Sequence, residues 1–219
     1  MALSRLVLHS ATCVTALLSL ALGGLRAEDS VVEKPYEYRD LRFGVTSAPT
    51  PSIRSEASDG SGSFDYDNSE SRGARFTMTY LIGRVPPERM ISTVYGGQLL
   101  LGTYSVGHAG NTTRLLQPMV DAYYGWQYGI VESPSLRGWF EMMPFVGLGS
   151  SVMEVDGKTR VGYAVETGVR FGAYLTERAW QFGVTSSGII GTSKVKSDIN
   201  ELTLNTNGFT FGAEVGYRF

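Results

Sequence analysis

The last segment of the chain alternates strictly between apolar and polar residues, and this pattern restricts the fold more than any other feature. One face of the segment carries Phe209, Phe211, Ala213, Val215, Tyr217 and Phe219, and the other carries Thr210, Gly212, Glu214, Gly216 and Arg218. Successive side chains of a β-strand point to opposite faces, so a period of two predicts a strand between an apolar and a polar environment.

The same alternation recurs along most of the chain. It predicts eight strands, near residues 39–48, 72–83, 89–104, 115–131, 138–153, 159–174, 179–192 and 208–219. The second, fourth and sixth connections are short, whereas the first and last, 49–71 and 193–207, are long. Alternate connections of an up-and-down antiparallel barrel lie at opposite rims, so the two rims differ. We therefore predict an all-β, eight-stranded, antiparallel up-and-down barrel with short periplasmic turns and longer extracellular loops.

Three features of the composition indicate that the apolar face contacts lipid. The polar face is rich in glycine, which suits the crowded interior of a narrow barrel. Its charges are few and mixed in sign, and the four lysines of the chain lie outside the central parts of the strands. Aromatic residues gather near the strand ends, as interfacial girdles do. A soluble eight-stranded barrel or sandwich is the alternative, because alternation alone does not say which face points inward.

The amino-terminal residues predict export. Residues 1–27 combine a basic start, an apolar run and a small-residue end, which is typical of a cleaved signal peptide. We expect residues 28–38 to form a short periplasmic segment and residues 39–219 to form the barrel. Cleavage removes Cys13, the only cysteine, so the mature chain has neither a disulfide nor a cysteine metal site. The net charge of −2 argues against nucleic-acid binding, and nothing in the sequence calls for a cofactor.

The signal peptide, the eight alternating strands and the ending Val215, Tyr217 and Phe219 resemble the small outer-membrane β-barrels of Gram-negative bacteria. That class includes the membrane domain of outer-membrane protein A, outer-membrane protein X and the opacity-type proteins. The resemblance implies location in the outer membrane, contact with outer-membrane lipids and lipopolysaccharide, and a monomeric barrel. It also implies that Val215, Tyr217 and Phe219 form the signal read by the barrel assembly machinery.

Charged residues on the polar face predict paired interactions inside the barrel, because an unpaired ion in a low dielectric is costly. The residues are Arg75, Asp121, Glu166, Arg170 and Glu214. Their distances from the strand ends place Arg170 at the height of Glu214, and Arg75 at the height of Glu166. We expect a salt-bridge plug, since eight strands enclose only enough space for side chains. A water-filled pore is the alternative.

The connections contain the remaining candidate chemistry. His108 is the only histidine of the mature chain, and an enzyme acting on lipid A would use a histidine to activate a serine. Asp65 and Asp67 space oxygen ligands at alternate positions, as cation-binding loops do, but the rest of an EF-hand is missing. We expect both to be ordinary loop residues, and the loop 49–71 to be flexible.

Taken together, the sequence predicts an outer-membrane barrel with a structural or adhesin-like role. We expect no general pore and no enzyme activity. An extracellular ligand would bind through loops 49–71 and 193–207. The alternatives are an outer-membrane enzyme that modifies lipid A and a narrow channel.

Overall fold

The computed structural model describes residues 36–49, 51–57, 59, 61–66, 72–85, 91–108, 111–132, 136–155, 158–196 and 200–219. The predicted signal peptide and residues 28–35 lie outside these ranges. Eleven strands are present: β1 (Tyr36–Ser47), β2 (Ser52–Ala57), β3 (Ser63–Tyr66), β4 (Arg72–Val85), β5 (Ile91–His108), β6 (Asn111–Glu132), β7 (Leu136–Val155), β8 (Lys158–Glu177), β9 (Trp180–Lys196), β10 (Asn200–Asn205) and β11 (Gly208–Arg218). None of the described residues forms a helix long and apolar enough to cross a membrane.

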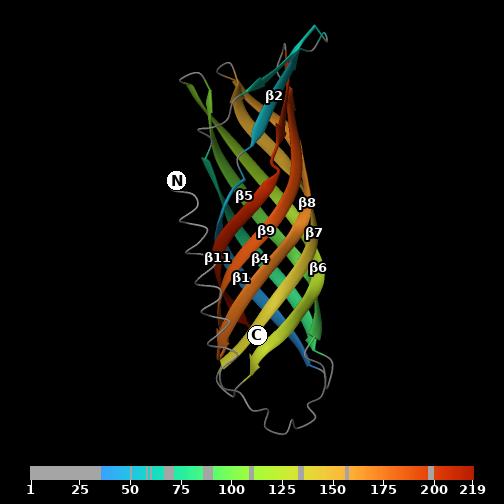
Figure 1. Cartoon of the computed structure of the whole chain (residues 1–219), viewed down its shortest axis with the longest axis vertical. Helices are drawn as coiled ribbons and strands as arrows, with labels where there is room; N and C mark the ends of the chain where they lie inside the picture. Colours follow the sequence, from blue (N-terminus) through green and yellow to red (C-terminus); the bar gives the residue numbers. More distant parts are fainter. Residues whose placement is uncertain are drawn as a thin grey trace, which may run out of the picture.

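Eight of these strands close into a barrel, as predicted. Neighbours pair antiparallel in the order β11, β1, β4, β5, β6, β7, β8 and β9, and the pairing of β9 with β11 completes the ring. Figure 1 shows the strands crossing the barrel obliquely. The predicted barrel boundary at residue 39 is three residues late, because β1 begins at Tyr36 and pairs there with Val85 of β4.

The strand register defines the tilt of the barrel wall. One row of paired positions runs once round the ring through Gly183, Glu214, Gly44, Thr77, Leu100, Met119, Gly149, Ala164 and Ser193. The row leaves β9 at residue 183 and returns to it at residue 193, so the stagger is ten residues. With a strand spacing of ~4.8 Å and a rise of ~3.3 Å per residue, this stagger corresponds to a tilt of about 40°.

The outer face of the barrel is apolar. Thirty-four large apolar side chains of the described residues are exposed there and at the strand ends. On β6, every second residue from Tyr128 to Leu116 is exposed and none of these residues is charged. The ten residues between Trp126 and Leu116 span about 25 Å along the barrel axis at this tilt, which is the height of the apolar band of outer-membrane barrels.

The described residues of the predicted long loops lie mostly in strands, and this corrects the expectation of a flexible segment at 49–71. β10 pairs with β9 in the register of β11, so β10 and β11 are one interrupted strand. β2 pairs with β10 much as β1 pairs with β11, and β3 pairs with β2. β5 and β6 extend to His108 and Asn111, so only residues 109 and 110 connect them, instead of the predicted loop. β2, β3 and β10, which we call the outer extension, lie at one end of the barrel (Figure 1).

A hydrophobic core fills the barrel beneath the outer extension. It is formed by Ile53, Tyr104, Leu115, Met153, Val195, Leu202 and Leu204, which come from β2, β5, β6, β7, β9 and β10. Leu204 and Val195 are fully buried. Burial of this apolar surface holds the outer extension to the barrel wall. The polar, serine-rich composition of the segment hid this core, because only alternate residues of β2 and β10 point inward.

Pro118 lies inside β6, where it pairs with Leu101 of β5. The backbone edge at which Pro118 lacks an N–H group therefore faces β7, and Pro118 has no paired residue on β7. Trp139 has the same inward phase on β7 as Glu141 and Met143, so it is 5 % exposed and stacks on Tyr174 inside the barrel. The pairing of β6 with β7 shifts register between Gly129 and Val131.

Candidate functional site: the charged lumen

The inner end of the lumen, near the short turns, is filled by a cluster centred on Arg42. Arg42 Nη1 donates to both carboxylate oxygens of Glu141, at 3.0 and 2.9 Å, and Nη2 donates to Asp40 Oδ2 at 2.8 Å. Arg42 Nε donates to Gln181 Oε1 at 3.0 Å. The guanidinium carbon lies 4.1 Å from the ring centre of Tyr174. Arg42, Asp40 and Glu141 are completely buried, so their charges depend on one another for stabilisation.

The last strand supplies a second arginine to this cluster. Arg218 donates from Nε and Nη2 to the two oxygens of Asp40, at 2.7 and 2.9 Å. Its guanidinium carbon lies 3.7 Å from the ring centre of Tyr38 and 4.2 Å from that of Trp139. This geometry is bidentate and stacked, and only arginine can make both contacts. Asp40 therefore joins β1 to β11 at the closing seam of the barrel.

The middle of the lumen contains the predicted ion pair between Arg170 and Glu214. The hydroxyl of Tyr174 donates to Glu214 Oε2 at 2.7 Å, and Arg170 Nη1 donates to Gln98 Oε1 at 3.2 Å. Arg170 Nη2 also lies 3.5 Å from Glu141 Oε1. Glu141 thus connects the middle pair to the inner cluster, and charges of opposite sign alternate through the lumen.

The other predicted ion pair, between Arg75 and Glu166, is also present. Asp121 lies beside it but forms no ion pair with any described residue. Its Oδ2 accepts a hydrogen bond from Gln98 Nε2 at 3.0 Å and lies 3.5 Å from the hydroxyl of Tyr123. Of the five residues predicted to form the plug, four therefore pair as expected, and Asp121 is held by neutral donors.

Little free space remains among these side chains. A cavity of about 20 Å³ lies at mid-height, lined in part by Arg75, Asp121 and Glu166. This volume is enough for one water molecule. Towards the outer end, Gln117 Nε2 donates to the hydroxyls of Ser151 and Ser193 at 3.0 and 3.2 Å. The lumen is thus occupied by side chains from the inner cluster to the hydrophobic core.

The sequence did not identify the inner cluster as a unit. Its members alternate correctly with their neighbours, which indicates that they point inward, but they come from four strands that are far apart in the chain. The set consists of Asp40, Arg42, Glu141, Gln181 and Arg218. Gln181 donates to Asp40 Oδ1 at 2.7 Å. Because its side chain is neutral, a search of the sequence for paired charges does not find it.

Two of the three loop candidates lie in strands. His108 is the last residue of β5 and its backbone pairs with Asn111. Asp65 lies in β3 opposite Arg54, whereas Asp67 is outside the described residues. Within the described ranges, no group of three or more histidine, cysteine, aspartate or glutamate side chains could hold a metal ion.

The outer extension carries an ion pair on its surface. Lys194 Nζ donates to Glu201 Oε1 at 2.6 Å, and Lys196 Nζ lies 3.5 Å from Glu201 Oε2. The hydrogen bond from Lys194 lowers the pKa of the Glu201 carboxyl and raises the pKa of Lys194. This pair connects β9 to β10, where the outer extension leaves the barrel wall.

The residues of the predicted assembly signal all point towards the membrane. Val215, Tyr217 and Phe219 are 40 %, 44 % and 60 % exposed on the apolar face. The backbone of Phe219 exchanges two hydrogen bonds of 3.0 Å with Arg39. The end of the chain is therefore part of the closed wall, with its alternate side chains available on the surface.

The closed ring, the uncharged exterior and the charged interior together decide the type of barrel. The fold is that of a small outer-membrane β-barrel. Solved structures similar to the chain include three proteins of this kind. The attachment invasion locus protein Ail of Yersinia pestis is 13 % identical, with 83 % of this chain and 98 % of that chain covered and a TM-score of 0.36.

The other two similar structures are equally distant in sequence. OprG, an outer membrane protein of Pseudomonas aeruginosa, is 11 % identical, with 87 % and 99 % covered and a TM-score of 0.41. Neisserial surface protein A is 11 % identical, with 85 % and 98 % covered and a TM-score of 0.36. No family model and no curated protein matches the chain. These likenesses concern the fold and carry no information about function.

Proposed function

We propose that the protein is an integral barrel of the outer membrane with a sealed lumen, and that it acts at the cell surface by binding a partner through its outer extension. The observation that carries this proposal is the different chemistry of the two faces of the barrel wall. Its outer face is uncharged over about 25 Å, whereas the charged residues of the central strands point inward and most form ion pairs.

The packed lumen argues against a transport role. Arg42 and Glu141 are fully buried in mutual contact, and the cavity at mid-height holds about 20 Å³. A solute could pass only if several buried ion pairs separated, and each separation would leave a charge without a partner in a low dielectric. The narrow channel therefore has less support than the sealed barrel.

The outer extension provides a rigid surface for binding. Its strands continue the wall beyond the apolar band, and on β9 the six residue steps from Ile190 to Lys196 add about 15 Å of height. Polar and charged side chains cover its outside, including Arg54, Glu56 and Glu201. A folded surface loses less conformational entropy on binding than a flexible loop does, which favours specific recognition.

An enzyme that modifies outer-leaflet lipid is the second candidate, because His108 lies at the outer end of β5. We expect His108→Ala to leave the lipid A species of the cell unchanged when they are compared by mass spectrometry. Loss of one modified species in this variant, with normal amounts of folded barrel, would establish the enzyme instead.

Membrane insertion and orientation can be tested together by cysteine labelling, because the mature chain has no cysteine. Ser61 is exposed in the turn between β2 and β3, and Arg178 is exposed in the short turn between β8 and β9. We expect Ser61→Cys to react with a membrane-impermeant maleimide in intact cells. We expect Arg178→Cys to react only after the outer membrane is permeabilised.

The same cells provide the control for the fold. The protein should fractionate with the outer membrane, and its migration on a denaturing gel should change on heating. A soluble periplasmic protein, or labelling of Arg178→Cys in intact cells, would contradict the proposal. Liposomes containing the barrel should not swell in small sugars, and rapid swelling would show that the lumen is open.

A further inference from the structure

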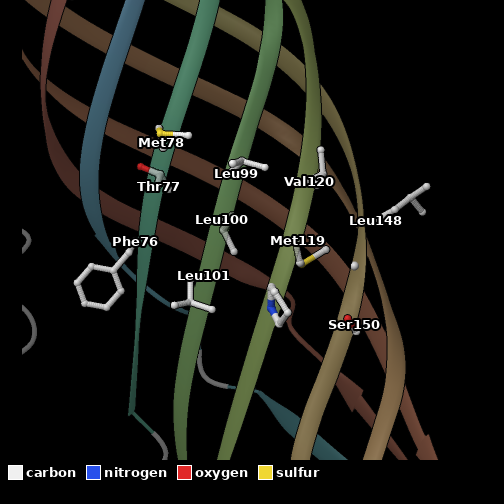
Figure 2. A pocket seen from close by; sticks show the side chains of 12 residues that line it. Phe76, Thr77, Met78, Leu99, Leu100, Leu101, Met119, Val120, Leu148 and Ser150 are labelled. Atoms are coloured by element: carbon white, nitrogen blue, oxygen red, sulfur yellow. The ribbon is translucent and has the colours of Figure 1, made fainter.

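A groove of about 600 Å³ lies on the wall formed by β4, β5, β6 and β7. Its lining is largely apolar and includes Phe76, Met78, Leu99, Leu101, Val120 and Leu148. Figure 2 shows Phe76 and Leu148 at opposite sides of the groove, with the residues of β5 and β6 between them. Most of these side chains point outward and are exposed, so the groove opens to the surroundings of the barrel.

Small side chains create this groove in an otherwise bulky surface. Paired positions place Phe76, Leu101 and Pro118 side by side on three neighbouring strands. On β7 the groove is lined by Gly149 and Ser150, which have little or no side chain. The ladder between β6 and β7 is also interrupted at Pro118. The depression is therefore built into the wall, and it lies in the outer half of the apolar band.

Two arginines lie beyond the outer end of the groove, four residues along their strands from the lining residues Phe76 and Pro118, which is about 13 Å. Arg72 of β4 pairs with Ser105 of β5, and Ser105 pairs with Arg114 of β6, so the three residues form one row across the wall. Both arginines are exposed, and neither has a hydrogen bond or ion pair with a described residue. They are separated by two strand spacings, which is about 10 Å.

We propose that this surface binds a lipid whose acyl chain occupies the groove and whose headgroup carries two phosphates, held by Arg72 and Arg114. The chemistry is that of the lipid A part of lipopolysaccharide, and the inference rests on the proposed outer-membrane location. Arginine recognises phosphate by charge-assisted, bidentate hydrogen bonds. Two exposed guanidinium groups at this spacing match a diphosphorylated disaccharide, whereas phosphatidylethanolamine offers one phosphate.

The proposal can be tested by native mass spectrometry of the folded barrel released from mild detergent. The probes are diphosphoryl lipid A, monophosphoryl lipid A and phosphatidylethanolamine. We expect the barrel to bind diphosphoryl lipid A about tenfold more tightly than monophosphoryl lipid A, which corresponds to the loss of one charged contact. Equal binding of the three lipids would overturn the proposal.

Variants separate the contributions of headgroup and acyl chain. The double variant Arg72→Gln and Arg114→Gln should bind the two lipid A forms equally. Ser150→Leu fills the groove and should weaken binding of both lipid A forms by a similar factor. The matched controls are Arg84→Gln, at the opposite end of β4, and Ala173→Leu, on the apolar face of β8. Both should bind as the unchanged barrel does.

The fold of every variant is measured separately by heat-dependent gel migration. If the barrel is inserted in the outer membrane but the arginine variant retains its preference for diphosphoryl lipid A, the lipid site is refuted and the proposed function stands. If the unchanged protein is not inserted, the proposed function fails first. Reduced binding by the controls equal to that of the test variants would show a general effect of surface substitution and would also refute the site.

Discussion

Replacing both Arg42 and Glu141 should destabilise the barrel less than replacing either residue alone. The chain of alternating charges runs through six side chains in the order Arg218, Asp40, Arg42, Glu141, Arg170 and Glu214. Arg42 and Glu141 are its middle pair. When both are replaced by methionine, the remaining four charges still form two complete pairs, one on each side.

The single variants leave an odd number of charges. In Arg42→Met, Glu141 keeps Arg170 at 3.5 Å, but that arginine is already paired with Glu214. In Glu141→Met, Arg42 must share Asp40 with Arg218. Breaking a buried ion pair by removal of one partner costs about 3–5 kcal/mol. Replacement of a whole buried pair by apolar residues of similar volume is often close to neutral.

The assay is unfolding of the barrel by urea in phospholipid vesicles, followed by tryptophan fluorescence. Trp126 and Trp180 lie on the exposed face and Trp139 is inside, so the signal reports both environments. We expect the free energy of unfolding to fall by about 3–5 kcal/mol in each single variant and by less in the double variant. If the double variant loses as much free energy of unfolding as either single variant, or more, the alternating-charge argument is refuted.

Three further predictions concern other parts of the molecule. Phe219→Ala retains the backbone bonds at the chain end but removes the terminal ring, so we expect less heat-modifiable barrel in isolated outer membranes; an unchanged amount would contradict an assembly role for the ring. The pKa of Glu201 is lowered by Lys194, so its ion pair stabilises the outer extension above the ordinary carboxyl pKa and is lost as pH falls through the lowered value. The protection factors of the β10 amides, corrected for the pH dependence of intrinsic exchange, should therefore fall on acidification, and Glu201→Gln should abolish this dependence. A Cβ atom at Gly125 would lie 2.2 Å from a carbonyl oxygen of the neighbouring strand, whereas one at Gly97 would have 3.3 Å. Gly125→Ala should thus reduce the folded fraction on the gel, and Gly97→Ala should leave it nearly unchanged.

The sequence predicts the strands well because the period of two is a local property. Every residue of a membrane strand faces either lipid or the lumen, so the pattern persists over its whole length. The same logic predicted the pairs of Arg170 with Glu214 and of Arg75 with Glu166, since both arguments required only the distance of each residue from a strand end. These expectations are confirmed by the ion pairs in the structure.

The inner cluster and the outer extension were less accessible, for different physical reasons. Asp40, Arg42 and Glu141 meet because of the register around the ring, which depends on a stagger accumulated over eight strands. No local pattern contains that stagger. Residues 52–57 and 200–205 are polar on one side and short, so their composition resembles a loop. Their apolar side chains can be recognised as part of a core only once the pairing of β2 with β10 is known.

Closure of the ring between β1 and β11 has a consequence for how the barrel forms. Arg218 and Glu214 belong to β11, and each supplies one of the two counter-ions of Asp40 and Arg170. Until β11 is in place, the ring has two open edges facing lipid, and Asp40 and Arg170 each have only one counter-ion. The two costs are removed in the same step. Pairing of β11 with β1 therefore closes the backbone edges and completes the network of ion pairs together, so a ring that lacks β11 lacks both contributions to stability.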